Sequence, residues 1–243
     1  FGNSICVSSQ AGCRMGCRFC ASTIGGLKRN LTPGEIAGQI LAAQRETGQR
    51  ISHVVVMGTG EPFDNYENLA KFLHIIHDPN GLNLSMRNIT VSTCGLVPMI
   101  ARFAEDFPQV NLAISLHAVS NEMRDEIMPV NKAYPMETLL SACRDYTQKT
   151  ARRVTFEYTL VKGVNDSAEY ARKLAARLQG MLCHVNLIPL NKVEETGYDT
   201  SERCAVLRFQ QVLTECGIPA TIRRELGDDI DAACGQLRLA ENG

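Results

Sequence analysis

Three cysteines, Cys13, Cys17 and Cys20, lie within eight residues and are the side chains of this sequence best suited to bind a metal. Their spacing is CxxxCxxC, and a thiolate is a soft ligand that suits zinc and iron–sulfur clusters. A cluster bound only by cysteine needs four thiolates, whereas this segment supplies three. Either a distant cysteine completes the set, or one iron stays open for another ligand. A structural zinc site prefers four ligands in fixed pairs, and the sequence contains no second CxxC pair.

The composition places this metal chemistry in a reducing compartment. The chain has 243 residues and ten unevenly spread cysteines, which does not match a small disulfide framework. It has no run of about 18 apolar residues and no recognisable signal peptide, so we expect no membrane span and a cytoplasmic location. The first residue is Phe1 rather than methionine, which leads us to expect a further segment upstream.

Positive charge is concentrated around the three cysteines, although the whole chain has a net charge of only −1. This net charge gives no global sign of nucleic-acid binding. Four cations nevertheless precede the first acidic residue, Glu35: Arg14, Arg18, Lys28 and Arg29. Two interpretations stay open, a surface that attracts anions such as an RNA backbone or an ordinary solvated loop.

Apolar, β-branched segments alternate with segments of helical period along the chain. The pattern predicts strands at residues 5–8, 51–57, 89–92, 110–116, 154–160, 184–188 and 220–223. It predicts helices at residues 33–48, 65–77, 97–105, 121–127, 136–149, 167–179 and 201–216. Residues 9–30 are rich in glycine and show no sustained period, which predicts a loop. The clustered cysteines are therefore expected in the loop that follows the first strand.

Strands that alternate with helices indicate parallel strands joined by right-handed crossovers, and hence an α/β fold. About six βα units are too few for a complete eight-fold barrel. A partial, open barrel and a flat, doubly wound sheet are both compatible with the pattern. No linker or low-complexity segment divides the sequence, so we expect one domain over residues 1–243.

Polar residues interrupt the apolar pattern where the predicted strands end. They are Glu61, Ser92, Ser115, His117 and Asn191. The cysteine loop follows the first strand in the same way. Because the carboxyl ends of parallel strands meet at one rim, in barrels and in open sheets alike, we expect these side chains to share a site.

Two of these strand ends leave a choice between a structural and a functional interpretation. The segment Gly58 to Pro62 is either a tight turn or a place where glycine lets the backbone approach a ligand. In the functional interpretation, Glu61 accepts a hydrogen bond from a cation such as an amino group. His117 is either a hydrogen-bonded core histidine or a residue of the site.

The remaining cysteines are interpreted from their surroundings. Five are expected to be small buried hydrophobic residues: Cys94, which lies close to the rim, and Cys143, Cys183, Cys204 and Cys216. Cys6 falls at the end of the first strand, and Cys234 lies in a glycine-bounded segment near the chain end. From the residues alone, both of these are compatible with having no chemical role.

Several motifs together resemble one family. The CxxxCxxC loop resembles the radical S-adenosylmethionine superfamily, and the surrounding motifs resemble the bacterial RlmN-type adenine-C2 methyltransferases of ribosomal and transfer RNA. The resemblance covers essentially the whole chain. Its motifs are CVSSQAGC at 6–13, GLKRN at 26–30, MGTGEP at 57–62, ISLH at 114–117, NLIPLN at 186–191 and DIDAACGQL at 229–237.

This resemblance implies a fold, cofactors and residue roles. It implies a partial, open parallel βα barrel of about six units, and a 4Fe–4S cluster bound by Cys13, Cys17 and Cys20. The open iron would bind the amino and carboxylate groups of S-adenosylmethionine, of which two molecules are used per turnover. The residues that match the family's contacts to this cofactor are Gly60, Glu61, Ser92, Ser115, Leu116, His117 and Asn191.

The resemblance also implies a route through two further thiols. Carbon 2 of adenine is electron-poor and does not attack a methyl sulfonium directly. In the family, the residue matching Cys234 accepts a methyl group by displacement, and a deoxyadenosyl radical then removes a hydrogen atom from that methyl group. The methylene radical adds to adenine, and Cys6 attacks the Cys234 sulfur to release the product, which leaves a Cys6–Cys234 disulfide. The family's proton acceptor and its N-terminal accessory domain would precede residue 1.

The implied function is methylation of carbon 2 of one adenine in the peptidyl-transferase region of 23S rRNA and one in the anticodon loop of tRNA. The implied partners are these RNAs and an electron donor such as flavodoxin or ferredoxin, and we expect a monomer.

Three alternatives stay open. A Cfr-type enzyme would modify carbon 8 of the rRNA adenine, although the sequence follows the RlmN-type pattern at Pro62 and at residues 188–190. A ferredoxin-like electron carrier would use the cluster without catalysis. A zinc-stabilised RNA-binding module would contain neither iron nor sulfide.

Overall fold

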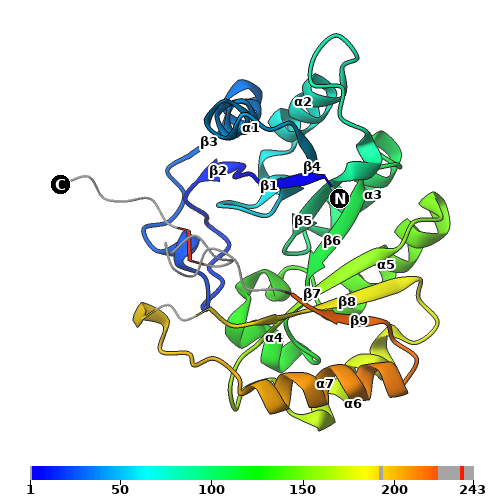
Figure 1. Ribbon diagram of the computed structural model, residues 1–243. Coiled ribbons are helices and arrows are strands. Elements are labelled where there is room, and N and C mark those ends of the chain that lie inside the picture. The colour runs from blue at the N-terminus through cyan, green and yellow to red at the C-terminus, as the bar shows by residue number, and fades with distance from the viewer. Residues whose placement is uncertain (1, 192–193, 224–235, 238–243) are drawn as a thin grey trace.

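Seven parallel strands form one sheet that organises the fold (Figure 1). The computed structural model describes residues 2–191, 194–223 and 236–237. Across the sheet the strands are β1 (Asn3–Cys6), β4 (Ile51–Val56), β5 (Ile89–Thr93), β6 (Asn111–Ser115), β7 (Val154–Leu160), β8 (Cys183–Pro189) and β9 (Ala220–Ile222). Every pair of neighbours is parallel. The carboxyl ends of these strands therefore lie at one rim.

Helices fill the crossovers between consecutive strands. They are α1 (Pro33–Thr47), α2 (Tyr66–His77), α3 (Val97–Asp106), α4 (Asn121–Ile127), α5 (Met136–Thr150), α6 (Ala168–Leu178) and α7 (Arg203–Glu215). Each predicted strand and helix is present, because hydrophobic period and end signals are local properties of the sequence.

The start of α1 illustrates such a local signal. Thr32 Oγ1 accepts a hydrogen bond from the Glu35 backbone N–H at 3.3 Å, and Glu35 Oε2 accepts from the Thr32 N–H at 2.8 Å. This reciprocal cap satisfies two N–H groups that the helix itself leaves unpaired, and a cap of this kind stabilises a helix by about 1 kcal/mol. Gly48, at φ 65°, ends the helix in the left-handed conformation that glycine adopts readily.

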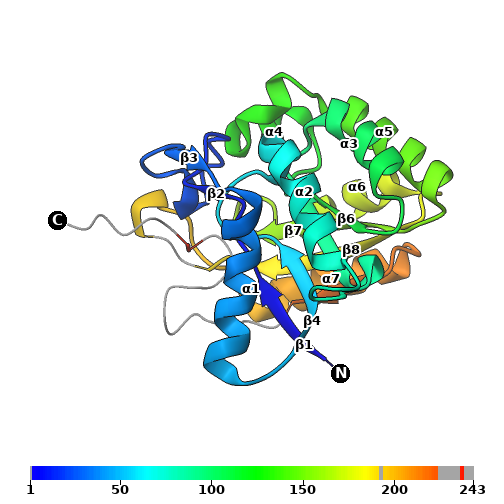
Figure 2. The ribbon, with the colours of Figure 1, turned by 90° about the horizontal axis from the view of Figure 1, so that it is seen from above.

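The order of the strands decides between the two folds that the sequence left open. The strands follow one another across the sheet in the order in which they occur in the chain, whereas a doubly wound sheet reverses its winding at a switch point. Figures 1 and 2 show the helices outside the sheet, with the loops of the rim gathered at one end. The prediction of a partial, open βα barrel is confirmed.

Side chains alternate between the two faces of each strand. On β5, Ile89 and Val91 are fully buried in the hydrophobic core with Phe72 of α2 and Phe103 of α3. Burying each such side chain stabilises the fold by about 1.5–3 kcal/mol. Ser92 has the opposite orientation and lines a pocket inside the open barrel. The outer face of the sheet is therefore a packing surface, while the inner face carries polar side chains.

The segment expected to be a simple loop has more structure than its sequence indicated. Within residues 9–30, β2 (Gln10–Ala11) pairs antiparallel with β3 (Arg29–Asn30), and a short 3-10 helix spans Ala21–Thr23. Strands of two residues are too short to show a period. At Gly12, φ is 78° and an added Cβ would lie 2.0 Å from the Gly26 carbonyl oxygen, so glycine is needed where the loop closes on itself.

The five cysteines expected to be buried do not behave alike. Cys94, Cys143 and Cys183 are buried, but Cys204 and Cys216 are exposed, which corrects the expectation for these two. Both lie on or at the end of α7, whose buried side chains are Val206, Phe209, Val212 and Leu213. Within the residues described, no helix is long and apolar enough to cross a membrane.

Candidate active site at the carboxyl end of the sheet

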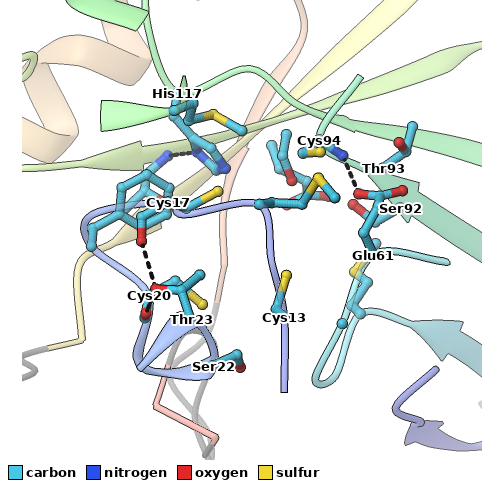
Figure 3. A pocket seen from close by; sticks show the side chains of 18 of the residues that line it. Cys13, Cys17, Cys20, Ser22, Thr23, Glu61, Ser92, Thr93, Cys94 and His117 are labelled. Atoms are coloured by element: carbon cyan, nitrogen blue, oxygen red, sulfur yellow. Dashed lines mark hydrogen bonds between the residues drawn. The ribbon is translucent and has the colours of Figure 1, made fainter. Parts of the chain in front are cut away.

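A pocket at the carboxyl rim of the sheet is lined by the cysteine loop, by residues at or near the ends of strands β4 to β8, and by Arg223, which follows β9 (Figure 3). Most of the predicted site residues line it: Cys13, Cys17, Cys20, Gly60, Glu61, Ser92, Ser115, His117 and Asn191. Residues up to 178 positions apart in the sequence thus meet in one cavity because parallel strands end on the same side.

The cysteine loop is fixed to its surroundings by backbone hydrogen bonds. Thr23 Oγ1 donates to the Cys20 carbonyl oxygen at 2.9 Å and lies 3.3 Å from that of Cys17. The Arg18 N–H donates to the carbonyl oxygen of Ile127, at the end of α4, at 2.9 Å. These bonds hold the loop against the pocket wall, so the three thiols face one cavity (Figure 3).

The chemistry of this donor set fits an iron–sulfur cluster. Three thiols line the same cavity, and within the described ranges no three His, Cys, Asp or Glu side chains converge on a single ion position. In a 4Fe–4S cluster each cysteine binds a different iron, so the thiols need not converge on one point. Burial raises the pKa of Cys13 to about 11 and is also the main cause of the raised pKa of Cys17 and Cys20. Cluster assembly must therefore release protons from these thiols.

Glu61 is a buried carboxylate whose position is set by backbone donors. Its Oε2 accepts from the Cys94 N–H at 2.7 Å and its Oε1 accepts from the Phe63 N–H at 3.0 Å. Burial raises the pKa of Glu61, while these N–H donors oppose the rise. A carboxylate has about four acceptor positions, so Glu61 can still accept from a bound ammonium group, and that cation would favour the ionised form.

The glycines before Glu61 are required by the packing of the chain, and because Gly58 and Gly60 also line the pocket, the functional interpretation of this turn stays a prediction. A Cβ at Gly58 would lie 2.6 Å from Ser8 Oγ, and a Cβ at Gly60 would lie 2.5 Å from Gln10 Cβ. Gly60 also has a φ of 106°, in the region that favours glycine. Both glycines are therefore required where β4 ends against the segment that follows β1.

His117 is both a hydrogen-bonded buried residue and a part of the pocket wall. Its Nδ1 accepts from the Thr159 N–H at 2.9 Å, which places the ring proton of the neutral form on Nε2. The Phe19 ring packs edge-on against it, with centroids 4.9 Å apart. Burial, helped by the positive charge of Arg124, lowers the pKa of His117 to about 3. His117 is thus a neutral hydrogen-bond donor or packing surface, and not a cation, at neutral pH.

Two described residues named from the family resemblance, Leu116 and Cys6, are not among those that line this pocket. The Leu116 side chain is fully buried in the core, and its N–H donates to the Glu157 carbonyl oxygen at 3.1 Å. Cys6 is exposed at the end of β1, where it is in register with Val55 of β4. Cys234, and with it the predicted Cys6–Cys234 disulfide, lies outside the described residues.

Several pocket residues escaped the sequence analysis, and Glu157 is the most informative of them. It lies in the middle of β7, is buried, and accepts from Asn186 Nδ2 at 2.8 Å. Burial raises its pKa. A carboxylate within the predicted strand at 154–160 was the signal that could have identified it. Thr93, Thr159 and Arg223 also line the pocket, as does Cys94, which was expected close to the rim.

Arg124 of α4 lies directly behind the pocket wall and is fully buried. Its Nη2 donates to the carbonyl oxygens of Cys94 at 2.6 Å and Ser115 at 3.2 Å, and its Nε donates to that of Leu116 at 3.2 Å. Its Nη1 donates to Asn131 Oδ1 at 3.2 Å. One guanidinium group thus ties together the ends of β5 and β6.

Two of the four cations near the cysteines are paired with carboxylates, which corrects the view that nothing offsets them. Arg14 forms an ion pair with Asp64, and Arg29 forms a two-pronged ion pair with Glu35, at 2.7 and 2.9 Å. Arg18 and Lys28 are exposed. The segment is therefore less cationic than its sequence suggested, because Asp64, distant in the chain, and Glu35, six positions from Arg29, supply counter-charges.

Comparison with known proteins agrees with this fold and site. The profile of the radical SAM superfamily matches residues 7–175. A crystal structure of a radical SAM methyltransferase from Sphaerobacter thermophilus superposes with a TM-score of 0.94 at 51% identity, covering 97% of this chain and 70% of that one. The class defined by the fold and the cysteine loop is thus that of radical SAM enzymes, whose cofactors are a 4Fe–4S cluster and S-adenosylmethionine.

Curated relatives narrow the class. A protein of Desulforamulus reducens, described as a probable dual-specificity RNA methyltransferase RlmN, is 56% identical over 98% of this chain and 68% of its own length. A protein of Geobacillus kaustophilus with the same description is 55% identical over 99% of this chain and 67% of its own length. The chain belongs to the RlmN family of radical SAM methyltransferases, which confirms the family indicated by the sequence motifs.

Proposed function

We propose that the protein methylates carbon 2 of specific adenines in 23S rRNA and in tRNA. The observation that carries this proposal is the meeting of three cluster-type thiols with Glu61, Ser92, Ser115, His117 and Asn191 in one pocket. The descriptions of its relatives as dual-specificity RNA methyltransferases support two classes of RNA substrate. The choice of carbon 2, and of these two RNAs, rests on the motifs that resemble the RlmN-type family.

When bound, the cluster and S-adenosylmethionine supply the one-electron chemistry that polar methyl transfer to this carbon lacks. The chain's own residues hold and orient these groups. Cys13, Cys17 and Cys20 would bind three irons and leave one open. Glu61, at the pocket wall and held by two backbone N–H donors, would accept from the ammonium group of the methionine moiety.

The hydroxyl and amide side chains at the strand ends would orient the rest of the cofactor. Ser92, Ser115 and Asn191 come from or directly follow three different strands and line the same pocket. The neutral His117 would present its Nε2–H or its ring face. Because these groups sit on the rigid rim of the sheet, the ligand can be held with little loss of freedom on binding.

Two further thiols, Cys234 and Cys6, complete the proposed chemistry. Cys234 would attack the methyl carbon of one S-adenosylmethionine as a thiolate, which forms a carbon–sulfur bond and releases S-adenosylhomocysteine. Cys6 would later attack the Cys234 sulfur to form a disulfide, and the electron pair of the broken sulfur–carbon bond would pass to the substrate carbon, which takes up a proton to complete the methyl group.

The proposed setting follows from this chemistry. The cluster needs an electron donor such as flavodoxin or ferredoxin, and reduced thiols are kept in the cytoplasm. We propose that the protein acts there as a monomer. The RNA is held through its bases and, at the rim, through phosphate contacts.

The deciding experiment is anaerobic reconstitution followed by mapping of modified adenines. The reconstituted protein, supplied with S-adenosylmethionine, a reductant and unmodified 23S rRNA or tRNA, should produce 2-methyladenine in both RNAs. Mass and position analysis of the nucleosides distinguishes the alternatives. Methylation of carbon 8 would identify Cfr-type chemistry, and iron reduction without RNA modification would identify an electron carrier. Zinc in place of iron and sulfide would identify a structural metal site.

The cations of the cysteine loop provide a second test, on RNA binding. Neutralising Arg18 and Lys28 with glutamine should weaken RNA binding and reduce the magnitude of the slope of log K against log salt by about 1.4, since each lost contact to a single-stranded phosphate reduces it by roughly 0.7. Filter binding over a salt series measures this slope.

The matched control is the pair of ion-paired arginines. Neutralising Arg14 and Arg29 should change the slope less, because their charge is already offset by Asp64 and Glu35. Equal slopes for both double variants and the unaltered protein would show that this surface does not bind the RNA backbone.

A further inference from the structure

The guanidinium group of Arg124 is a buried positive charge without a carboxylate partner. Among the ion pairs of the described residues, none involves Arg124. Its hydrogen bonds go to three backbone carbonyl oxygens and one side-chain amide. An arginine stays protonated in a protein, and a buried charge that lacks an opposite charge is costly to the fold. Among the described residues, no carboxylate side chain therefore supplies the counter-charge of this cation.

The position of this cation points to the group that balances it. Two of the carbonyl oxygens that Arg124 binds belong to Cys94 and Ser115, and both of these residues line the cofactor pocket. Cys17, one of the three cluster thiols, is among the groups whose charge acts on Arg124. Cysteines bind a cluster as thiolates, so a bound cluster would add negative charge to this pocket.

The acidic groups near Arg124 do not serve as its partner. Asp125 is partly exposed and accepts from Asn131 Nδ2 at 2.8 Å. Glu61 binds the N–H of Cys94 on the pocket side, where the ammonium group of S-adenosylmethionine is proposed to bind. The other groups whose charge acts on Arg124 are the thiols of Cys94, Cys17 and Cys143. The cluster thiolates are thus the negative charge that the site lacks.

We propose that Arg124 is the fixed counter-charge of the 4Fe–4S site and raises the reduction potential of the cluster. This inference rests on the proposed function, because it needs a cluster at Cys13, Cys17 and Cys20. Adding one electron increases the negative charge of the site, and a buried cation nearby stabilises the reduced form more than the oxidised form. Net charge is among the properties that set the potential of such clusters.

Arg124 has a structural role beside its charge. Its hydrogen bonds join the backbone at the ends of β5 and β6, which carry Ser92 and Ser115. Two substitutions separate the effect of the charge from that of the hydrogen bonds. Lysine retains the charge but not the four-way bonding, whereas glutamine removes the charge and keeps a polar side chain.

The test is a potentiometric titration of the reconstituted protein with dithionite, in the absence of S-adenosylmethionine, followed by the electron paramagnetic resonance signal of the reduced cluster. R124Q should have a more negative midpoint potential than the unaltered protein, and R124K should restore most of the difference. The control is R102Q, since Arg102 is an exposed arginine of α3 that is paired with Glu67 and Asp106. R102Q should leave the potential unchanged.

A variant that is expected to shift the midpoint potential in the opposite direction keeps the test decisive if R124Q does not fold or does not hold a cluster. D125N removes a negative charge that acts on Arg124 from the neighbouring position of α4, so it should make the potential less negative, by a smaller amount because Asp125 is partly exposed. A purely structural role for Arg124 predicts lower thermal stability without a change of potential.

The possible failures are distinguishable. If R124Q loads a cluster whose potential equals that of R102Q, or if R124Q is not obtained and D125N is unchanged, the inference is overturned while the proposed function stands. If the unaltered protein binds zinc instead of iron and sulfide, both are overturned.

Discussion

Cys17→Ala will prevent assembly of a stable 4Fe–4S cluster and will reduce RNA methylation to the background of the assay. Cys17 lines the pocket with Cys13 and Cys20, and the three thiols are the only cysteines of the loop. Removing one leaves a second iron without a protein ligand, and the remaining two thiolates cannot hold the cluster against loss of iron. Iron and sulfide content after anaerobic reconstitution, together with the cluster absorbance, measures the effect.

Cys204→Ala is the matched control because Cys204 is an exposed cysteine on α7. Its iron content and methylation should equal those of the unaltered protein. Cys94 also lines the pocket, beside Glu61 (Figure 3). Full cluster content in Cys17→Ala would contradict the ligand assignment, and its loss in the double variant with Cys94→Ala would identify Cys94 as the substitute ligand.

Cys234→Ala will abolish methylation but leave the cluster in place. Cys234 matches the methyl-carrying thiol of the family by its motif DIDAACGQL. It is not among the proposed cluster ligands, so iron and sulfide content should not change. Without a thiolate to accept the methyl group, the first transfer cannot occur. Labelled S-adenosylmethionine should transfer its methyl group neither to the protein nor to RNA.

The companion variant Cys6→Ala should fail at a different step. This variant should accept a methyl group on Cys234 and form a covalent bond to RNA. The RNA should then remain attached to Cys234 because the resolving thiol is missing. A protein–RNA adduct that survives denaturing electrophoresis is the expected result. The control is Cys216→Ala, a substitution at an exposed cysteine. Formation of methylated adenine by the Cys234→Ala variant would contradict the role of Cys234 as methyl carrier.

Much of the site could be predicted because its residues lie at places that local pattern identifies. The strand ends were located from apolar runs, and Glu61, Ser92, Ser115, His117 and Asn191 were found as the polar residues next to them. The structure brings all five into one pocket. This success has a physical cause, since parallel strands that alternate with helices necessarily place their carboxyl ends together.

Other parts of the site depend on contacts that no local pattern reports. Arg124 belongs to a short helix, and its burial becomes evident only when its bonds to Cys94, Ser115 and Leu116 are seen. The packing role of the turn glycines was not evident for the same reason, because the atoms that an added Cβ would meet belong to residues 8 and 10. Asp64, which neutralises Arg14, is fifty positions away in the sequence.

The sequence by itself determined the kind and order of the elements, the metal-binding loop and the family. Each of these depends on residue types and short spacings, which are local properties and do not depend on how the rest of the chain folds. Only the tertiary structure decided that the sheet winds in one direction into an open barrel, and which charges near the cysteines are balanced. Strand order and ion pairing are set by packing between distant segments, and the free energy of that packing depends on several segments at once rather than on any single one.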